Sequence, residues 1–209
     1  AKTTLVQRHI EWLLGRASLG LDGFTKNWAR DFRIVYISNT AHQAYRLSIA
    51  VKATIEGNRL YRAIFPKVKP HKEKWSQEEW KVAGNDSKDA NMFATGRGGP
   101  VLGARAIKAI LDDLADDEYA ESVTVRVACV GVRTANGFDG SGWLDTTVDK
   151  MMVPWGRQLM TATRWHWDDP AAWAEESGWF KLEQQAIVQD ETGEEQSFWE
   201  ERFPLVQLQ

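Results

Sequence analysis

The chain has 209 residues, of which 43% are hydrophobic and 26% charged, and its formal net charge is −3. These values are typical of one globular domain, and they exclude a strongly basic nucleic-acid-binding protein, so any contact with nucleic acid must be local or come from a partner. No apolar run reaches the length of about 18 residues that a membrane span needs, and the opening residues do not predict a signal peptide. The single cysteine, Cys129, excludes an internal disulfide and suits a reducing compartment.

The first part of the chain predicts a helix followed by a strand–turn–helix unit. Residues Thr3–Leu14 have apolar positions at helical spacing, and Gly15 is the expected end of that helix. The segment Arg33–Ser38 has the β-branched and aromatic composition of a strand. Asn39 and Thr40 follow it as N-cap residues for a long helical pattern.

The middle of the chain predicts fewer regular elements. A short helix is expected at Arg59–Phe65, and Lys67–Lys74 is expected to be a basic loop that is either solvated or in contact with phosphate. The segment Ala90–Leu102 contains GRGGP and is expected to be rich in turns. The apolar run after it predicts a buried strand that ends at Asp112 and Asp113.

Alternating strands and helices continue towards the C-terminus and predict an α/β fold with a mainly parallel sheet. The pattern at Val123–Val132 fits a strand or a helix equally well. The other expected elements are a loop at Gly137–Gly142, a strand at Arg157–Thr163, a helix at Ala171–Glu176, and a hairpin formed by Phe180–Val188 and Gln196–Phe198.

The residues AKTT at the N-terminus fit the end of a phosphate-binding loop. Such a loop ends in Gly-Lys-Ser/Thr at a helix start, where backbone N–H groups, a lysine and a hydroxyl hold a triphosphate and magnesium. Lys2 and Thr3 stand at the front of the first predicted helix, where that lysine and hydroxyl belong. An ordinary helix start without a ligand is the alternative.

The adjacent carboxylates of Asp112 and Asp113 admit two interpretations. They either begin a solvated loop or form part of a metal–phosphate site at the end of the strand. In phosphate-loop ATPases the first carboxylate holds magnesium, and the next acidic residue polarises the attacking water. A third feature, QLMTATRWHWDD, is a predicted strand with a polar threonine–arginine end, which suits a sensor of the γ-phosphate.

The order of these features resembles that of the large terminase subunit of tailed bacteriophages, the motor that packs DNA into a procapsid. Nearly the whole chain takes part in the resemblance. The matching segments are WLLGR, FRIVYISNT, YRAIFP, WSQEEW, ATGRGGPVLGARAIKAILDD, MTATRWHWDD and SFWEERFPL.

The resemblance implies a RecA-like, additional-strand P-loop ATPase core with a mainly parallel sheet flanked by helices, which uses ATP and Mg²⁺. Asp112 would then associate with magnesium and Asp113 would take the catalytic carboxylate position, where many relatives have glutamate. The other implied site residues are Lys2, Thr3, Asn39 and Thr40 for the nucleotide, Thr3 also for magnesium, and Thr161 and Thr163 for coupling.

An arginine finger is also expected, because charge develops on the γ-phosphate during phosphoryl transfer. Arg97, Arg105 and Arg164 are the candidates, and no motif chooses among them. His166, with the two aspartates that follow, suggests a metal cluster; a hydrogen-bond network, or a helix cap by Asp168 before Pro170, explains the same residues.

The resemblance further implies double-stranded DNA, a portal protein and a small terminase subunit as partners, a homo-oligomeric ring, no membrane, and the cytoplasm of an infected bacterial host. Two departures stand beside it. The chain begins at Ala1, where the family has a glycine preceded by the rest of the phosphate loop, and the family's nuclease domain does not follow Gln209. Residues 1–209 are therefore expected to be a motor domain trimmed at both ends. The alternatives are a non-catalytic assembly fragment and another P-loop nucleic-acid motor, such as a helicase.

Overall fold

The computed structural model describes residues 2–21, 23, 27–101, 103–183, 185, 187–190, 192–201 and 204–208. Ala1, and Arg202 and Phe203 of SFWEERFPL, lie outside these residues. The chain forms two compact units, Ala1–Glu176 and Ser177–Gln209, and each is described by itself. Among the described residues, no helix combines the length and the apolar content that a membrane crossing requires.

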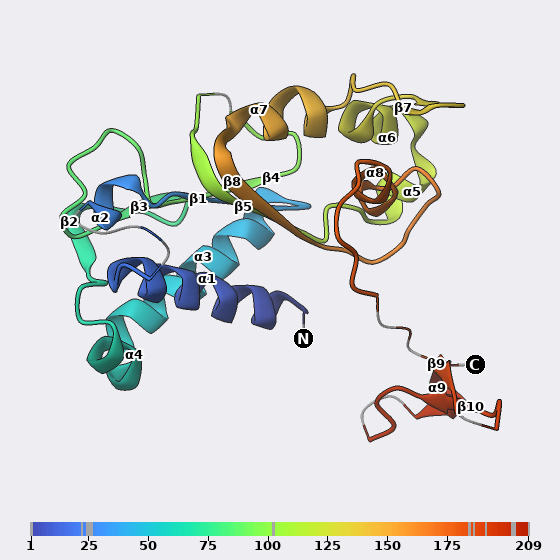
Figure 1. Cartoon of the computed structure of the whole chain (residues 1–209), viewed down its shortest axis with the longest axis horizontal. Coiled ribbons are helices and arrows are strands. Elements are labelled where there is room, and N and C mark those ends of the chain that lie inside the picture. Colours follow the sequence, from blue (N-terminus) through green and yellow to red (C-terminus); the bar gives the residue numbers. More distant parts are fainter. Residues whose placement is uncertain are drawn as a thin grey trace. The chain divides into compact units, whose positions relative to one another are not determined.

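The first unit is an α/β unit built on a six-stranded sheet with the order β2-β3-β4-β1-β5-β8 (Figure 1). Four neighbouring strands, β4, β1, β5 and β8, run parallel, and β3 and β2 continue the sheet in antiparallel fashion. The predicted α/β class with a mainly parallel sheet is confirmed. The strands are β1 (Ile34–Ser38), β2 (Pro70–Trp75), β3 (Glu79–Val82), β4 (Met92–Gly96), β5 (Ala106–Asp112) and β8 (Met152–Thr161).

The register of the parallel strands brings their carboxyl ends to one edge of the sheet. Ser38 of β1 is paired with Gly96 of β4 and with Asp112 of β5, and Asp112 is paired with Thr161 of β8. All five residues of β1 are buried, as expected for a parallel strand covered on both faces. Loops that follow these ends are therefore close neighbours, and ligands of open α/β sheets bind at such an edge.

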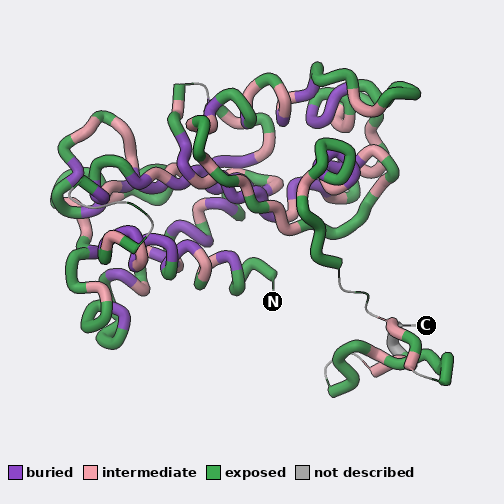
Figure 2. The backbone as a smooth tube through the Cα atoms, in the orientation of Figure 1, coloured by how far each residue is buried: buried purple, intermediate pink, exposed green. Residues whose placement is uncertain are grey.

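Two long helices, α1 (Lys2–Ser18) and α3 (Ala41–Gly57), pack on one side of the sheet (Figure 1). Figure 2 shows buried residues along their inner sides and along the central strands. The prediction that Gly15 ends the first helix is wrong, because α1 continues to Ser18. Gly15 serves packing instead: a Cβ atom there would lie 2.5 Å from the ring of Phe65.

Three local predictions change in the structure. The basic loop predicted at Lys67–Lys74 is wrong from Pro70 onwards, because β2 forms there and pairs with β3 through Trp75 opposite Trp80. The turn-rich segment Ala90–Leu102 contains β4, which the sequence pattern did not indicate. The segment Val123–Val132, which fitted a strand or a helix equally well, forms helix α6 as far as Val130. The Ser122 hydroxyl caps this helix by accepting from the Val125 N–H at 3.3 Å.

The remaining elements of the first unit are short. The predicted strand at Arg157–Thr163 is confirmed as far as Thr161, where β8 ends, and the predicted loop at Gly137–Gly142 begins with β7. The helix that begins at Pro170 is linked to the π-helix that begins at Leu144, because the indole N–H of Trp173 donates to Asp145 at 2.9 Å. These elements are α2 (Trp28–Asp31), α4 (Arg59–Ile64), α5 (Asp117–Glu121), α6 (Val123–Val130), β6 (Arg133–Thr134), β7 (Gly137–Phe138), the π-helix η1 (Leu144–Val148), α7 (Asp149–Met151) and α8 (Pro170–Glu176).

The second unit contains the predicted hairpin in a shorter form. β9 (Ile187–Gln189) pairs antiparallel with β10 (Glu195–Ser197), and α9 (Leu205–Leu208) follows. The carboxylate of Asp190 organises the turn, because it accepts hydrogen bonds from the hydroxyl and the N–H of Thr192. These bonds, with others to the same carboxylate, lower the pKa of Asp190 to about 2.

Asn91 joins the start of β1 to the strands beside it. Its fully buried side chain donates to the carbonyl oxygens of Ala29 at 2.6 Å and Phe32 at 2.7 Å. Its amide oxygen accepts from the Val82 N–H at 2.9 Å and from the Asn85 side chain at 2.8 Å. Every donor and acceptor of this amide is therefore satisfied, which a buried polar group requires.

We predict that Asn91→Ala lowers the free energy of unfolding by about 3 kcal/mol or more, because several buried backbone and side-chain groups lose their partners. Urea denaturation followed by circular dichroism measures the change. Asn136→Ala, in an exposed turn, is the matched control and should stay within about 0.5 kcal/mol of wild type. Equal stability of the two variants would contradict the role given to Asn91.

Candidate functional site

Asp112 is a buried carboxylate at the carboxyl end of β5, with an exposed fraction of 2%. Both of its oxygens accept hydrogen bonds from neighbouring strands. The phenol of Tyr36 on β1 donates to Oδ2 at 2.7 Å, and the hydroxyl of Thr161 on β8 donates to Oδ1. The orientation of the Asp112 carboxylate is therefore determined by both flanking strands.

The environment of Asp112 also changes Tyr36. Burial raises the pKa of the Tyr36 phenol well above its ordinary value, and the charge of Asp112 and the hydrogen bond to it raise this pKa further. Tyr36 is itself only 1% exposed. Its hydroxyl therefore stays protonated, and able to donate a hydrogen bond, at neutral pH and well above it.

Asp113 turns the chain away from the strand. Its φ of 45° lies in the left-handed region, and it is the one residue other than glycine with a positive φ in the described part of the chain. The strained conformation costs about 1 kcal/mol and is retained by a hydrogen bond from its N–H to the Thr161 carbonyl oxygen at 2.9 Å. Such strain is found preferentially at functional sites.

Lys2 connects the start of α1 to this edge of the sheet. Its ammonium group donates to Asp113 Oδ1 at 2.8 Å and to the Thr163 hydroxyl at 2.5 Å. Thr163 also donates to Asp113 at 3.2 Å. Because Lys2 and Asp113 are 44% and 40% exposed, the ion pair adds little to stability. Its importance is that three predicted site residues, far apart in sequence, meet at one point.

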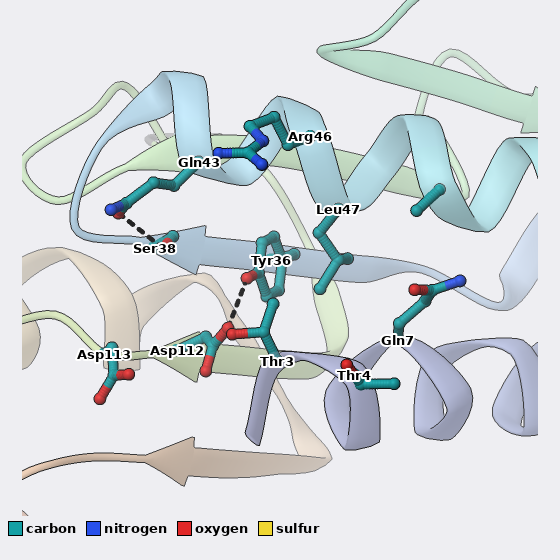
Figure 3. A pocket seen from close by; sticks show the side chains of 11 residues that line it. Thr3, Thr4, Gln7, Tyr36, Ser38, Gln43, Arg46, Leu47, Asp112 and Asp113 are labelled. Carbon is teal, nitrogen blue, oxygen red and sulfur yellow. Dashed lines mark hydrogen bonds between the residues drawn. The ribbon is translucent and has the colours of Figure 1, made fainter. Parts of the chain in front are cut away.

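A cavity of about 400 Å³ opens beside these carboxylates. Figure 3 shows α3 along one side of the cavity and α1 along the other, with the ends of β1 and β5 between them. Its lining residues come from α1 (Thr3, Thr4, Gln7), β1 (Tyr36, Ser38), α3 (Gln43, Arg46, Leu47, Ala50) and the end of β5 (Asp112, Asp113).

The polar groups in this cavity suit a hard cation with a phosphate ligand. Magnesium prefers carboxylate and hydroxyl oxygens, and it usually binds through one or two carboxylates, several waters and substrate phosphates. Asp112 and Thr3 line the same cavity and supply those two ligand types. In the described part of the chain, no group of three or more His, Cys, Asp or Glu side chains could hold a metal ion.

Asn39 and Thr40 lie after β1, but neither lines the cavity. The Thr40 hydroxyl accepts from the Gln43 N–H at 3.3 Å, and the Gln43 side chain accepts from the Thr40 N–H, so these residues form a capping box for α3. The Asn39 side chain donates to Asp116, and its buried amide oxygen has no hydrogen-bond partner among the described residues. The nucleotide contacts expected for these two residues stay predictions, and the helix cap is confirmed for Thr40, whereas the Asn39 side chain binds Asp116 instead.

The three arginine-finger candidates lie in different environments. Arg97 donates to the Leu114 carbonyl oxygen at 2.6 Å, so it holds the loop that follows β5. Arg164 forms ion pairs with Asp169 at 3.2 Å and with Glu175. Arg105 directly precedes β5, at the end of the strand opposite Asp112, and is not among the residues that line the cavity.

His166 and its neighbouring aspartates form a hydrogen-bond network. The imidazole accepts from the Asp168 N–H at 3.0 Å. The helix cap predicted for Asp168 belongs instead to Asp169, which directly precedes Pro170 and accepts from the Ala172 N–H at 2.8 Å. Asp169 is fully buried, and its second oxygen accepts from the Trp165 N–H and pairs with Arg164.

Of the residues that line the cavity, sequence reasoning named Thr3, Asp112 and Asp113, and it missed the others, Tyr36 and Arg46 among them. Tyr36 stands in the middle of an apolar strand, and its hydroxyl was the only local signal of a polar role. Arg46 stands inside a long helical pattern, where an arginine is usually a solvated residue, so no local signal marked it.

Because the native pKa of Tyr36 is raised, this tyrosine contributes stability that is fully present below the unfolded-state pKa of about 10 and is lost as pH rises beyond it. We predict that the wild-type free energy of unfolding falls by about 1 kcal/mol more between pH 10 and pH 11 than that of Tyr36→Phe. Urea denaturation at both pH values measures the difference. Tyr61→Phe, which removes another buried phenol with a raised pKa, is the comparison and should give a shift of the same size. Parallel pH curves for wild type and Tyr36→Phe would contradict the assignment.

Comparison of the chain with known protein families and with curated proteins found no match.

Proposed function

We propose that the chain is the ATP-hydrolysing motor domain of a phage DNA-packaging terminase, which couples hydrolysis to the translocation of double-stranded DNA into a procapsid. The observation that supports this function most directly is the meeting of Lys2 with Asp113 and Thr163, beside a cavity lined by Thr3 and Asp112. These are the lysine, hydroxyl, paired carboxylates and polar strand end that ATP hydrolysis in such a motor requires.

The order of the parallel strands supports a RecA-like, additional-strand arrangement. The strand that ends in the paired carboxylates, β5, lies between β1 and β8, and β8 ends in the polar segment proposed to sense the γ-phosphate. Among the described strands, β8 has a neighbour on only one side, and Trp155 on it is 67% exposed. We propose that a further strand pairs with β8 and leads into the remainder of a phosphate loop before Lys2.

The residues in and beside the cavity would have different roles in hydrolysis. Lys2 leaves Asp113 and binds the phosphates of ATP, since a phosphate group offers it more negative charge than one exposed carboxylate does. Thr3 and Asp112 would hold magnesium, which supplies charge neutralisation on the phosphate oxygens. The Asp113 carboxylate, released from Lys2, orients a water molecule and accepts its proton as the water oxygen bonds to the γ-phosphorus and ADP leaves with the electrons of the broken bond.

Coupling to movement would begin at β8. Thr161 donates to Asp112, and Thr163 donates to Asp113, so the end of β8 contacts both proposed catalytic carboxylates. A change in the charge or position of either carboxylate during hydrolysis would therefore shift β8 first. In the proposed ring, docked on a portal protein and supplied with DNA by a small terminase subunit in the host cytoplasm, such shifts would be transmitted to the DNA.

We predict that Asp112→Asn lowers the ATPase rate at least 100-fold without unfolding the protein, because the proposed magnesium ligand loses its charge. Asp113→Asn should lose activity for lack of a proton acceptor, whereas Asp113→Glu should keep part of it. Phosphate release measures the rates, and Asp86→Asn on an exposed loop is the control. Normal turnover by folded Asp112→Asn would overturn the assignment.

A second prediction concerns the proposed strand and loop. A form of the protein that includes them should melt at a higher temperature and bind ATP more tightly than residues 1–209 alone, because the edge of β8 gains a partner and the phosphates gain ligands. Thermal denaturation and ATP titration of the two forms measure both effects. If the two forms behave alike in both measurements, Lys2 and Thr3 do not belong to a phosphate loop.

A further inference from the structure

The cavity beside Asp112 has an uneven charge distribution. Asp112 and Asp113 lie at its end formed by β5, and Arg46 on α3 is the one cation among the described residues that line it. Figure 3 shows Gln43 and Arg46 extending from α3, across the cavity from Thr3 and Thr4 on α1. A ligand in this space therefore meets a cation on the α3 side as well as carboxylates at the end of the sheet.

The Arg46 side chain is available to bind a ligand, whereas the neighbouring Gln43 side chain is already engaged within the protein. Gln43 is engaged by the Ser38 hydroxyl at 3.3 Å and by the Thr40 N–H. In the part of the chain that the structure describes, no hydrogen bond or ion pair engages the Arg46 guanidinium. The side chain is also exposed, so it can adjust its position without breaking contacts within the protein.

The three arginine-finger candidates from the sequence analysis are less suited to bind a ligand in the cavity. Arg97 is bound to the Leu114 carbonyl oxygen, and Arg164 is paired with two carboxylates. Arg105 lies at the opposite end of β5. Within one chain, Arg46 is thus the arginine whose place and unengaged donors suit an anion in the cavity.

We propose that Arg46 binds the terminal phosphate of a nucleoside triphosphate in this cavity and thereby distinguishes the triphosphate from the diphosphate. This proposal rests on the proposed ATPase function. A guanidinium presents parallel N–H donors that match two phosphate oxygens, whereas the diphosphate leaves this side of the cavity without an anion to contact. Arg46 would act from α3 while Lys2 acts from α1, so the two cations would hold the phosphate from opposite sides.

The test compares the binding of MgATP and MgADP by isothermal titration calorimetry on wild type, Arg46→Ala, Arg46→Lys and Arg59→Ala. Arg59 lies exposed at the start of α4, and its removal controls for the general loss of one positive charge. We expect Arg46→Ala to weaken MgATP binding about tenfold and to leave MgADP binding within about twofold, because one charge-assisted contact is lost. Arg46→Lys should recover part of the loss, and Arg59→Ala should bind both nucleotides as wild type does.

An unchanged ratio of the MgATP and MgADP affinities in Arg46→Ala would overturn the proposal, as would a wild type that does not prefer MgATP. Failure of the proposed function has a different signature. A wild type that selects MgATP through Arg46 but releases no phosphate would refute hydrolysis and keep the Arg46 contact. A wild type that hydrolyses ATP with a ratio insensitive to Arg46 would refute only the contact, and no binding of either nucleotide by the form that includes the proposed strand and loop would refute both.

Discussion

The paired hydrogen bonds to Asp112 are the constraint on which the candidate site depends. A carboxylate that is 2% exposed is stable only when its oxygens are satisfied, and Tyr36 and Thr161 satisfy them from the strands on either side. These bonds need the register that pairs Asp112 with residues of both β1 and β8. A shift of one residue in either strand would turn the hydroxyl away, since successive side chains point to opposite faces of a sheet.

The same register explains why charged groups gather at one edge. Asp113 follows the buried strand directly and leaves it through a strained turn, so its carboxylate reaches the surface where Lys2 can contact it. The result is a buried, rigidly oriented carboxylate next to an exposed and adjustable one. That division suits a site in which one carboxylate holds a metal ion and the other handles a proton, because the two tasks need different mobility and solvation.

Positive and negative groups lie on different sides of the proposed site. The cationic groups, Lys2 at the start of α1 and Arg46 on α3, lie on the two helices, while the carboxylates lie at the end of the sheet. A polyphosphate bound between the helices would therefore meet cations from both helices, and Asp112 and Thr3 are the residues that would hold its magnesium ion. Among the described strands, β8 has a neighbour on one side only, so its other edge, which carries the exposed Trp155, could pair with the further strand proposed above.

Local patterns in the sequence determined the elements that depend on near neighbours. The β-branched run before Ser38, the capping residue Thr40 and the apolar run that ends at Asp112 predicted β1, the start of α3 and β5, because strand composition and helix caps act over a few residues. The phosphate-loop and carboxylate patterns, and the resemblance to terminases that their order suggested, assigned Lys2 and Asp113 to one expected site.

Only the tertiary structure decided what those elements bring together. The bond from Lys2 to Asp113 spans 111 positions, and the bond from Tyr36 to Asp112 spans 76, so both depend on strand register and helix packing, which no short window of sequence contains. The sequence did not predict β2, because its lysines are typical of a solvated loop. An edge strand such as β2 is stabilised by pairing rather than by its own apolar content. Arg46 likewise became a candidate ligand-binding residue because α3 lines the cavity at the end of β5, whereas its own sequence neighbourhood predicts only a solvated helix.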